Sequence, residues 1–442
     1  MPVKKKFEHH FSEENLIRLY KDKVSLSEAT GIDNLNQKSF FPTLEEQTHI
    51  ISDKVLKGSF KFTKYKLKLI SKGRGKVPRE ISIPTIRDRI ALRALCNFLV
   101  ECYKDQVISE LPQNIVKKIK TEIRSEKYNG FIKLDVSNFY PTIKHDEILK
   151  KLQKKISNPE IITFIKESIS TPTVLKSHPG DKKPTLGVPQ GLSISNILAS
   201  IYLLEIDKQL MNDPNIAYHR YVDDIFIMCT HESVKGISSD VIKKFEEIGL
   251  KIHKPNGGSG KSVLGKINEG FDYLGYQFKG DLISPRATSI EKLKDSIVSI
   301  FTSHKHAKHP NKNFLLWRLN LRITGCVFEN KSKGWMFFFL EINNETILHN
   351  LDRHIKHLVD RFQIDIKPQC FVRSYYEIMH SKHRTTYIPN FDRYPIKKME
   401  EVLVDYFKFE AGSLSDEEVK FEFKKRISKQ AKDLLTDVQN FS

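Results

Sequence analysis

The sequence predicts an α+β fold in which strands that carry carboxylates precede a mostly helical region. Residues 130–136 and 216–228 are apolar runs without a helical period, which is typical of buried strands. Residues 145–156 instead repeat apolar side chains at helical spacing, and the chain after residue 280 is mostly of this second kind. A chain of 442 residues has room for about three domains of ordinary size.

Two adjacent carboxylates, Asp223 and Asp224, interrupt the second apolar run directly after Tyr221 and Val222. Asp is disfavoured in strands, and two neighbouring anions raise each other's pKa. A hairpin turn beside a cation tolerates such a pair, and divalent metal ions are the obvious candidates. Taken alone, the two residues could equally be ordinary turn residues, because Asp is common in hairpin turns.

A third carboxylate, Asp135, lies near the end of the first apolar run. Because side chains alternate across a strand, Ile132, Leu134 and Val136 share one face, while Lys133 and Asp135 share the other. One Asp at a strand end and two at a hairpin tip can meet on a single sheet. Two Mg²⁺ ions about 3.5–4 Å apart require such a cluster for phosphoryl transfer.

A turn segment rich in Gly and Pro, Gly187–Gly191, lies between the two carboxylate strands and leads into helical spacing from Ile194. Pro and Gly favour a tight backbone entry into the helix. Gln190 offers both a hydrogen-bond donor and an acceptor at the bend. Alone, the Pro-Gln-Gly sequence is weak evidence for a functional site. Between two strands that carry carboxylates, it is strong evidence for one.

In this order the segments resemble those of reverse transcriptases, over roughly residues 60–280. The matching segments are Leu134–Tyr140, Val188–Gly191, Tyr221–Asp224 and Phe271–Tyr276, preceded by Arg79–Arg89. The Arg79–Arg89 segment resembles the fingers segment of group II intron, retron and defence-associated bacterial enzymes. The resemblance implies a right-hand polymerase with fingers, a palm built on an antiparallel sheet, and a helical thumb.

The expected domains follow from that resemblance. They are an N-terminal extension (1–60), fingers (61–130, with part of 145–185), palm (131–280), and a helical thumb with the C-terminal region (281–442). Within the last domain we expect Ser289 to cap a helix, and Ser415 and Glu418 to form a capping box.

The resemblance also implies the metal site. Asp135 and Asp223 would bridge two Mg²⁺ ions, for which Mn²⁺ could substitute, while the Val136 carbonyl completes one coordination shell and Asp224 supports it from the hairpin. The chemistry agrees, because metal ions activate the primer 3′-hydroxyl and neutralise the leaving pyrophosphate.

Five residues are expected at the dNTP: Tyr140, Phe139, Gln190, Arg79 and Lys72. The Tyr140 ring would lie against C2′ of the sugar and exclude a 2′-hydroxyl, although an ordinary core role is the alternative. Arg79 and Lys72 belong to a cationic hairpin that suits a triphosphate, since guanidinium offers bidentate contacts.

The resemblance implies that a basic residue near Gly249 protonates the pyrophosphate, and Lys254 and Lys261 are both candidates. The expected primer and template contacts are Arg87, Arg89, Tyr221, Arg353 and Lys356. For Arg87 and Arg89 a structural ion-pair cluster is the alternative, and for Arg353 and Lys356 it is a solvated helix face.

The formal net charge of +19 and the isoelectric point near 9.4 indicate a polyanionic partner without separating DNA from RNA. Five Cys show no paired or metal-type spacing, and neither a signal peptide nor a transmembrane run is evident. We therefore expect a cytoplasmic protein with no membrane partner.

We expect an RNA-directed DNA polymerase that copies a structured noncoding RNA template into a DNA product from dNTPs, with a role in bacterial antiviral defence. Two alternatives remain open: an intron-encoded or retron enzyme acting in mobility or RNA splicing, and a template-independent or protein-primed DNA polymerase. A partner protein or a homo-oligomer is also compatible with the sequence.

Overall fold

The computed structural model describes residues 2–71, 73, 75, 77–108, 110–257, 260–382 and 384–438. The chain divides into two compact units. They are Met1–Ser109 with Phe131–Leu264, and Glu110–Gly130 with Gly265–Ser442.

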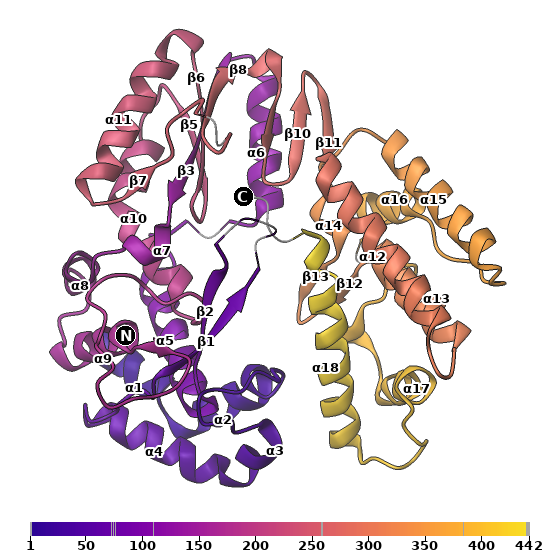
Figure 1. Ribbon diagram of the computed structural model, residues 1–442, viewed down its shortest axis with the longest axis horizontal. Coiled ribbons are helices and arrows are strands. Elements are labelled where there is room, and N and C mark those ends of the chain that lie inside the picture. The colour runs from indigo at the N-terminus through magenta and orange to yellow at the C-terminus, as the bar shows by residue number, and fades with distance from the viewer. Residues whose placement is uncertain are drawn as a thin grey trace. The chain divides into compact units, whose positions relative to one another are not determined.

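The first unit combines helices with two sheets (Figure 1). Its helices are α1 (Val3–His10), α2 (Glu13–Leu19), α3 (Gln37–Phe40), α4 (Leu44–Leu56), α5 (Ile86–Tyr103), α7 (Phe139–Thr142), α8 (His145–Gln153), α9 (Pro159–Ser170), α10 (Ser195–Met211) and α11 (Val234–Glu247). Its strands are β1 (Tyr65–Ile70), β2 (Arg79–Ile83), β3 (Gly130–Ser137), β4 (Thr173–Val174), β5 (Ala217–Tyr221), β6 (Asp224–Cys229) and β7 (Lys251–Ile252), with β8 (Val263–Lys266) at the unit boundary.

The sheet with the predicted carboxylates has the order β5-β6-β3-β7, and β8 pairs with β3. Strands β5 and β6 form an antiparallel hairpin, and Figure 1 shows this hairpin beside β3. Ile132, Leu134 and Val136 of β3 belong to the same buried core as Ile197 and Leu198 of α10. The predicted strand, its apolar face and the hairpin are therefore confirmed.

A second sheet has the order β2-β1-β4. Strands β1 and β2 pair in an antiparallel register from Lys66↔Ile83 to Ile70↔Arg79, whereas β4 runs parallel to β1. The hairpin predicted from the basic segment is therefore present. Lys72, which the sequence predicts at the dNTP, lies outside the described residues.

The N-terminal helices pack into the core of the first unit rather than away from it. The ring of Phe7 meets Phe98 of α5 edge-on at 5.1 Å between centroids, and Phe11 meets Phe164 of α9 at 5.5 Å. Phe11 and Ile51 are fully buried. Residues 1–60 are thus integral to this unit.

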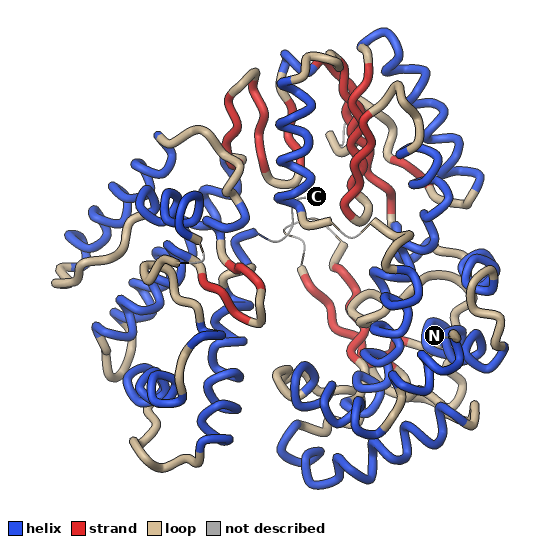
Figure 2. Tube along the Cα trace, turned by 180° about the vertical axis from the view of Figure 1, so that it is seen from behind, coloured by secondary structure: helices blue, strands red, loops and turns tan. Residues whose placement is uncertain are grey.

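The second unit is mainly helical, as Figure 2 shows by the blue tube that dominates it. Its helices are α6 (Pro112–Arg124), α12 (Ala287–Lys305), α13 (Lys312–Thr324), α14 (Trp335–Phe338), α15 (Thr346–Phe362), α16 (Phe371–Ser381), α17 (Ile396–Phe407) and α18 (Asp416–Asp433). Its strands are β9 (Phe271–Tyr273), β10 (Tyr276–Lys279), β11 (Leu282–Pro285), β12 (Cys326–Phe328) and β13 (Lys331–Lys333), all paired antiparallel. The predicted α+β fold class is confirmed.

The two helix caps predicted for this unit have different outcomes. The capping box is confirmed, because the Ser415 amide donates to the Glu418 carboxylate at 2.9 Å. The Ser289 cap is wrong: α12 follows β11 directly, its N-cap is Arg286, and Ser289 is buried in the first turn. Helix α12 therefore begins at Ala287, two residues before Ser289.

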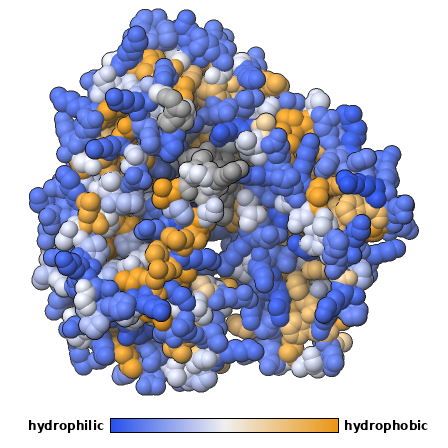
Figure 3. Space-filling model, in the orientation of Figure 1, coloured by the Kyte–Doolittle hydropathy of each residue, from blue (hydrophilic) through white to orange (hydrophobic). Residues whose placement is uncertain are grey.

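The surface is mostly hydrophilic on the face that Figure 3 shows, with apolar residues in small groups. Among the described helices, none combines the length and the hydrophobicity that crossing a bilayer requires.

Candidate functional site

The adjacent carboxylates lie at the turn between β5 and β6. Val222 precedes them with a φ of 58°, in the left-handed region that β-branched residues rarely adopt. The Arg220 guanidinium donates from Nη1 to the Val222 carbonyl at 2.8 Å. Arg220 therefore holds an unfavourable backbone conformation that presents Asp223 and Asp224.

A buried ion pair fixes Arg220 in turn. Its Nε donates to Oδ1 of Asp207 at 2.7 Å, its Nη2 donates to the second carboxylate oxygen, and the Tyr218 hydroxyl donates to Oδ1 at 2.7 Å. Both charged side chains are 2% exposed. Although burial opposes the charge, the hydrogen bonds and charge of Asp207 raise the pKa of Arg220. The turn is thereby anchored to helix α10.

The carboxylates occupy an environment that disfavours their charge. Asp135 is 5% exposed and Asp224 is 9% exposed. Burial, followed by the charge of Asp223, raises the pKa of Asp224 to about 7. Burial also raises the pKa of Asp223, and the charge of Asp135 adds to the rise. The three predicted carboxylates are thus brought into mutual electrostatic contact.

Two basic side chains lie beside Asp135. Lys261 Nζ lies 3.2 Å and His253 Nε2 lies 3.3 Å from the same carboxylate oxygen of Asp135. The His253 amide donates to the Asp135 carbonyl at 3.0 Å, and the Asp135 amide donates to the Ser262 hydroxyl at 3.1 Å. Both basic candidates are exposed, and of the two it is Lys261 that contacts Asp135. His253 was not predicted, although it lies next to Lys254.

The Gly–Pro segment, residues 187–191, is hydrogen-bonded both to α7 and to the β1–β2 hairpin. The Val188 amide donates to the Tyr140 carbonyl at 2.8 Å, and the Ser82 amide of β2 donates to the Gln190 carbonyl at 2.7 Å. Gly191 has a φ of 101°, and a Cβ there would lie 2.7 Å from Ile81 Cγ2. Only glycine permits this close approach.

The predicted nucleotide-site residues are brought together in part. Phe139 is buried and its ring centroid is 5.5 Å from that of Tyr140. The Tyr140 hydroxyl donates to Oδ1 of Asn196 at 2.6 Å. Burial raises the pKa of Tyr140, and the charge of Asp223 adds to the rise, while Arg79 opposes it. Tyr140, Asp223 and Arg79 therefore share one electrostatic environment.

Comparison with known proteins identifies the family of this region. Residues 70–278 match the family model described as "Reverse transcriptase (RNA-dependent DNA polymerase)". These residues form a reverse transcriptase domain. The chain is accordingly an enzyme, an RNA-directed DNA polymerase of the nucleotidyltransferase class.

Individual relatives are distant. Protein YkfC of Escherichia coli (strain K12) is 23% identical over 296 residues, covering 56% of this chain and 75% of YkfC. The putative COX1/OXI3 intron 1 protein of Saccharomyces cerevisiae is 27% identical over 212 residues, covering 46% of this chain but only 24% of that protein. Telomerase from Candida albicans, solved with a fragment of telomeric RNA, aligns with a TM-score of 0.46 at 15% identity, covering 92% of this chain and 69% of that one.

Two cations predicted near the template of the reverse transcriptase domain are occupied within the chain. Arg87 Nη2 lies 2.9 Å from Oδ1 of the fully buried Asp88 and also donates to the Lys61 carbonyl. Arg89 Nη2 donates to the Ala29 carbonyl at 2.5 Å. Arg87 therefore matches the structural ion-pair alternative more closely than an open template surface. Arg89 is held through a backbone carbonyl, and its Nε and Nη1 are buried without a hydrogen-bond partner among the described residues.

The remaining predicted contacts lie on partly or fully accessible positions. Tyr221 is half-buried at the end of β5. Arg353 and Lys356 are exposed on α15, where Arg353 donates to Asn350 at 2.6 Å. They belong to the second unit, outside the matched reverse transcriptase domain.

The carboxylates of the reverse transcriptase domain suit a divalent metal ion of the kind that this family generally uses. Within the described part of the chain, no three His, Cys, Asp or Glu side chains form a ready-made metal cage. Mg²⁺ does not require one, because it is bound through one or two carboxylates together with water and substrate phosphates. Buried oxygens that repel each other and attract Lys261 are a suitable donor set.

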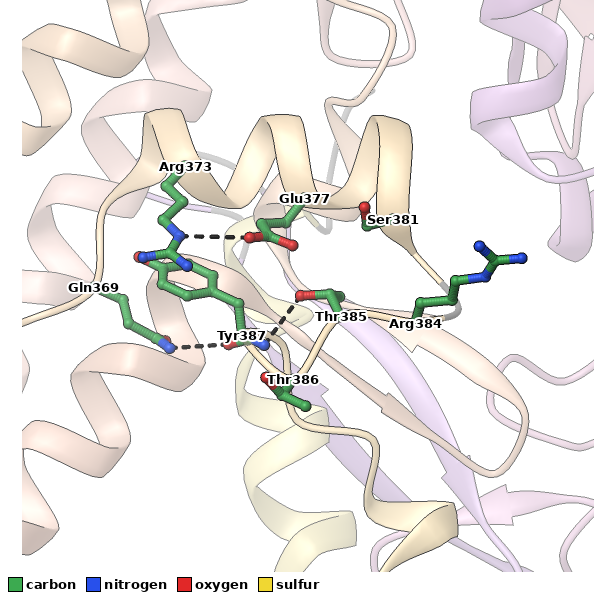
Figure 4. A pocket seen from close by; sticks show the side chains of 8 residues that line it. All are labelled: Gln369, Arg373, Glu377, Ser381, Arg384, Thr385, Thr386 and Tyr387. Atoms are coloured by element: carbon green, nitrogen blue, oxygen red, sulfur yellow. Dashed lines mark hydrogen bonds and ion pairs between the residues drawn. The ribbon is translucent and has the colours of Figure 1, made fainter.

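A polar cavity in the second unit encloses about 420 Å³ beside the end of α16 (Figure 4). Figure 4 shows Arg373 above the Tyr387 ring, 4.3 Å from its centroid, and paired with Glu377. Arg373 is therefore already balanced and stacked, although Arg384 also lines the cavity. Because no predicted site residue lines it, we assign this cavity no role in catalysis.

Proposed function

We propose that the site adds deoxynucleotides to a nucleic-acid 3′-hydroxyl with two Mg²⁺ ions held by Asp135, Asp223 and Asp224. The observation that carries this proposal is the position of these carboxylates: Asp135 lies near the end of β3, and Asp223 and Asp224 lie at the turn of the neighbouring β5–β6 hairpin. The bound ions would supply activation of the attacking hydroxyl and stabilisation of the leaving pyrophosphate.

Two further groups beside Asp135 would take part in the reaction. The Val136 carbonyl adds an oxygen ligand beside Asp135. Lys261, whose ammonium group lies 3.2 Å from Asp135, carries the proton for the pyrophosphate in preference to Lys254. Lys261 would have to leave the Asp135 oxygen when a metal ion binds there.

The nucleotide would lie between the fingers-type hairpin and α7. Arg79 binds the triphosphate through its guanidinium, which suits phosphate oxygens bidentately. Tyr140 forms the surface for the sugar, and the buried Phe139 ring packs behind it, with ring centroids 5.5 Å apart. Gln190, fixed through its carbonyl to β2, would face the same nucleotide. Tyr140 would exclude a 2′-hydroxyl and thereby select dNTPs.

For the domain organisation we propose fingers at 61–130 with part of 145–185, a palm at 131–280 and a thumb at 281–442. The exposed Arg353 and Lys356 of α15 would contact the backbone of the template–primer duplex. Tyr221, half-buried next to the carboxylates, would contact the primer end. The charge of +19 supports a polyanionic partner of this kind.

For the biological role we propose that the enzyme copies a structured noncoding RNA in antiviral defence. The similarity to a yeast intron protein favours a second candidate, an intron-encoded enzyme that acts in mobility or splicing. The two candidates differ in their RNA, which would be a dedicated noncoding transcript in the first case and intron sequence in the second.

The deciding experiment purifies the protein from its native cells and sequences both the co-purifying RNA and the DNA formed from added dNTPs. We expect DNA complementary to one bound RNA species. DNA formation that is independent of any RNA would contradict the proposal and favour template-independent synthesis. The Asp223→Asn variant, which should retain the RNA without making DNA, is the control for contaminating polymerases.

A further inference from the structure

One hydrogen bond links the proposed sugar-contacting residue to a helix far from it in the sequence. The Tyr140 hydroxyl donates to Oδ1 of Asn196 at 2.6 Å, across 56 positions of the chain. Tyr140 lies in the single turn of α7, whereas Asn196 is the second residue of α10. A distance of 2.6 Å is at the short end of the range for a strong O–H···O hydrogen bond.

The two ends of this link are held independently of it. At one end, the Tyr140 carbonyl accepts a hydrogen bond from the Val188 amide at 2.8 Å. At the other end, the buried Ser195 hydroxyl donates to the Pro189 carbonyl at 2.6 Å, which fixes the start of α10. Asn196, whose side chain is exposed, is therefore presented from a rigid base, and Tyr140 is held at both its backbone and its hydroxyl.

The free ring would have more freedom than the tethered one. A Tyr side chain moves about two torsions, and the torsion next to the ring has a broad energy minimum. Tyr140 is only partly buried, so packing alone does not fix the ring completely. A hydrogen bond at the far end of the side chain restricts both torsions at once.

We propose that Asn196 is a positioning residue that holds the Tyr140 ring at the angle required to exclude a 2′-hydroxyl, and so helps to set selectivity for deoxyribonucleotides. This inference rests on the proposed role of Tyr140 at the sugar. Asn196 itself does not touch the nucleotide; it acts through the Tyr140 hydroxyl.

The test compares kcat/KM for a dNTP with that for the matching NTP on one RNA template and primer. Asn196→Leu removes the acceptor at similar volume, Asn196→Asp retains an acceptor, and Tyr140→Phe removes the donor but keeps the ring. Asn212→Ala, at the exposed opposite end of the same helix, is the matched control. Thermal unfolding of each variant verifies that it is folded.

We expect Asn196→Leu and Tyr140→Phe each to reduce discrimination by about two- to tenfold, the effect of one hydrogen bond. The gain in NTP use should appear in KM and kcat for the NTP, which a general loss of fold would not produce. Asn196→Asp should retain most of the discrimination. The double variant should resemble the single ones, because both changes break the same contact.

Two results would overturn the inference. One is unchanged discrimination in both Asn196→Leu and Tyr140→Phe. The other is an Asn196→Leu effect of full size in the Tyr140→Phe background, since Asn196 would then act on the nucleotide directly. Tyr140→Ala distinguishes failure of the proposed role of Tyr140 from failure of the positioning role of Asn196. If Tyr140→Ala leaves discrimination unchanged, Tyr140 does not exclude the 2′-hydroxyl. If Tyr140→Ala relaxes discrimination but Asn196→Leu has no effect, only the positioning role is refuted.

Discussion

Arg220 and Val222 form the contact that fixes the carboxylate turn: the guanidinium donates to the Val222 carbonyl at 2.8 Å while its other edge pairs with Asp207. A left-handed backbone costs an L-residue roughly 1–2 kcal/mol. The buried ion pair therefore stabilises a turn that the sequence of the turn does not itself favour.

Arg220→Gln should reduce both stability and activity. Because it leaves the Asp207 carboxylate buried without its partner, we expect the free energy of unfolding to fall by about 3–5 kcal/mol. Activity should fall further than the unfolded fraction explains, because Val222 can leave the left-handed conformation. Urea unfolding and primer extension at a temperature where the variant is folded measure the two effects.

Val222→Gly in the Arg220→Gln background should restore part of the activity, because glycine adopts positive φ without strain. Val222→Ile, which stays β-branched, is the matched control and should restore none. If Val222→Gly alone is active but the double variant is no more active than Arg220→Gln, Arg220 acts through something other than the turn.

Local patterns predicted the elements of the site but not the links between them. The apolar alternation of Ile132, Leu134 and Val136 fixed the face on which Asp135 lies, and a continuous apolar run identified β6. The partner of Arg220 lies 13 positions away on a helix, a separation that carries no local period. The available signal was a charged residue, Asp207, on an otherwise apolar helix face.

The absence of a local signal for contacts between distant residues also explains the other predictions that the sequence left open. The sequence could not choose between Lys254 and Lys261, because the choice depends on how the loop folds back onto Asp135. It left Arg87 open between two roles for the same reason. At Ser289 a local signal was present but misleading, since the strand before α12 decided where the helix begins.

Asp223→Asn should abolish incorporation, by about 10³-fold or more, because it removes a proposed metal ligand, and a bound metal ion stabilises the transition state by several kcal/mol. The fold should survive, since one of several repelling buried carboxylates becomes neutral. Mg²⁺ should raise the unfolding temperature of the wild type by binding the folded state, and do so less in the variant. Retained primer extension, or an equal Mg²⁺ effect in both proteins, would contradict the metal assignment.

Lys261 and Lys254 offer a matched pair of variants. Lys261→Met should lower kcat with little change in the KM for dNTP, because it removes the cation beside Asp135 rather than a ground-state contact. Lys254→Met, which changes an exposed side chain of the same loop, should leave kcat within about twofold, as expected for a surface substitution. A larger loss in Lys254→Met would reverse the assignment of the proton donor.

His145 should make stability depend on pH in mildly acidic solution. Its Nε2 lies 2.7 Å from the Gly187 carbonyl, and it is 5% exposed. Burial lowers the pKa of His145, and the hydrogen bond to Gly187 only partly offsets this. The folded protein therefore binds the proton less readily than the unfolded chain does.

As the pH falls below about 6.5, the unfolded chain takes up this proton first, so stability is lost down to the folded-state pKa. The loss is about 1.4 kcal/mol for each unit by which the pKa is lowered. Asp223 and Asp224 have raised pKa values and change stability in the opposite sense. The measurement is therefore the difference in unfolding free energy between the wild type and His145→Gln.

Gln keeps a donor for the Gly187 carbonyl but cannot titrate, so this difference in unfolding free energy should shrink or reverse as the pH falls. A constant difference from pH 7.5 to 5 would show that His145 does not cause the pH dependence.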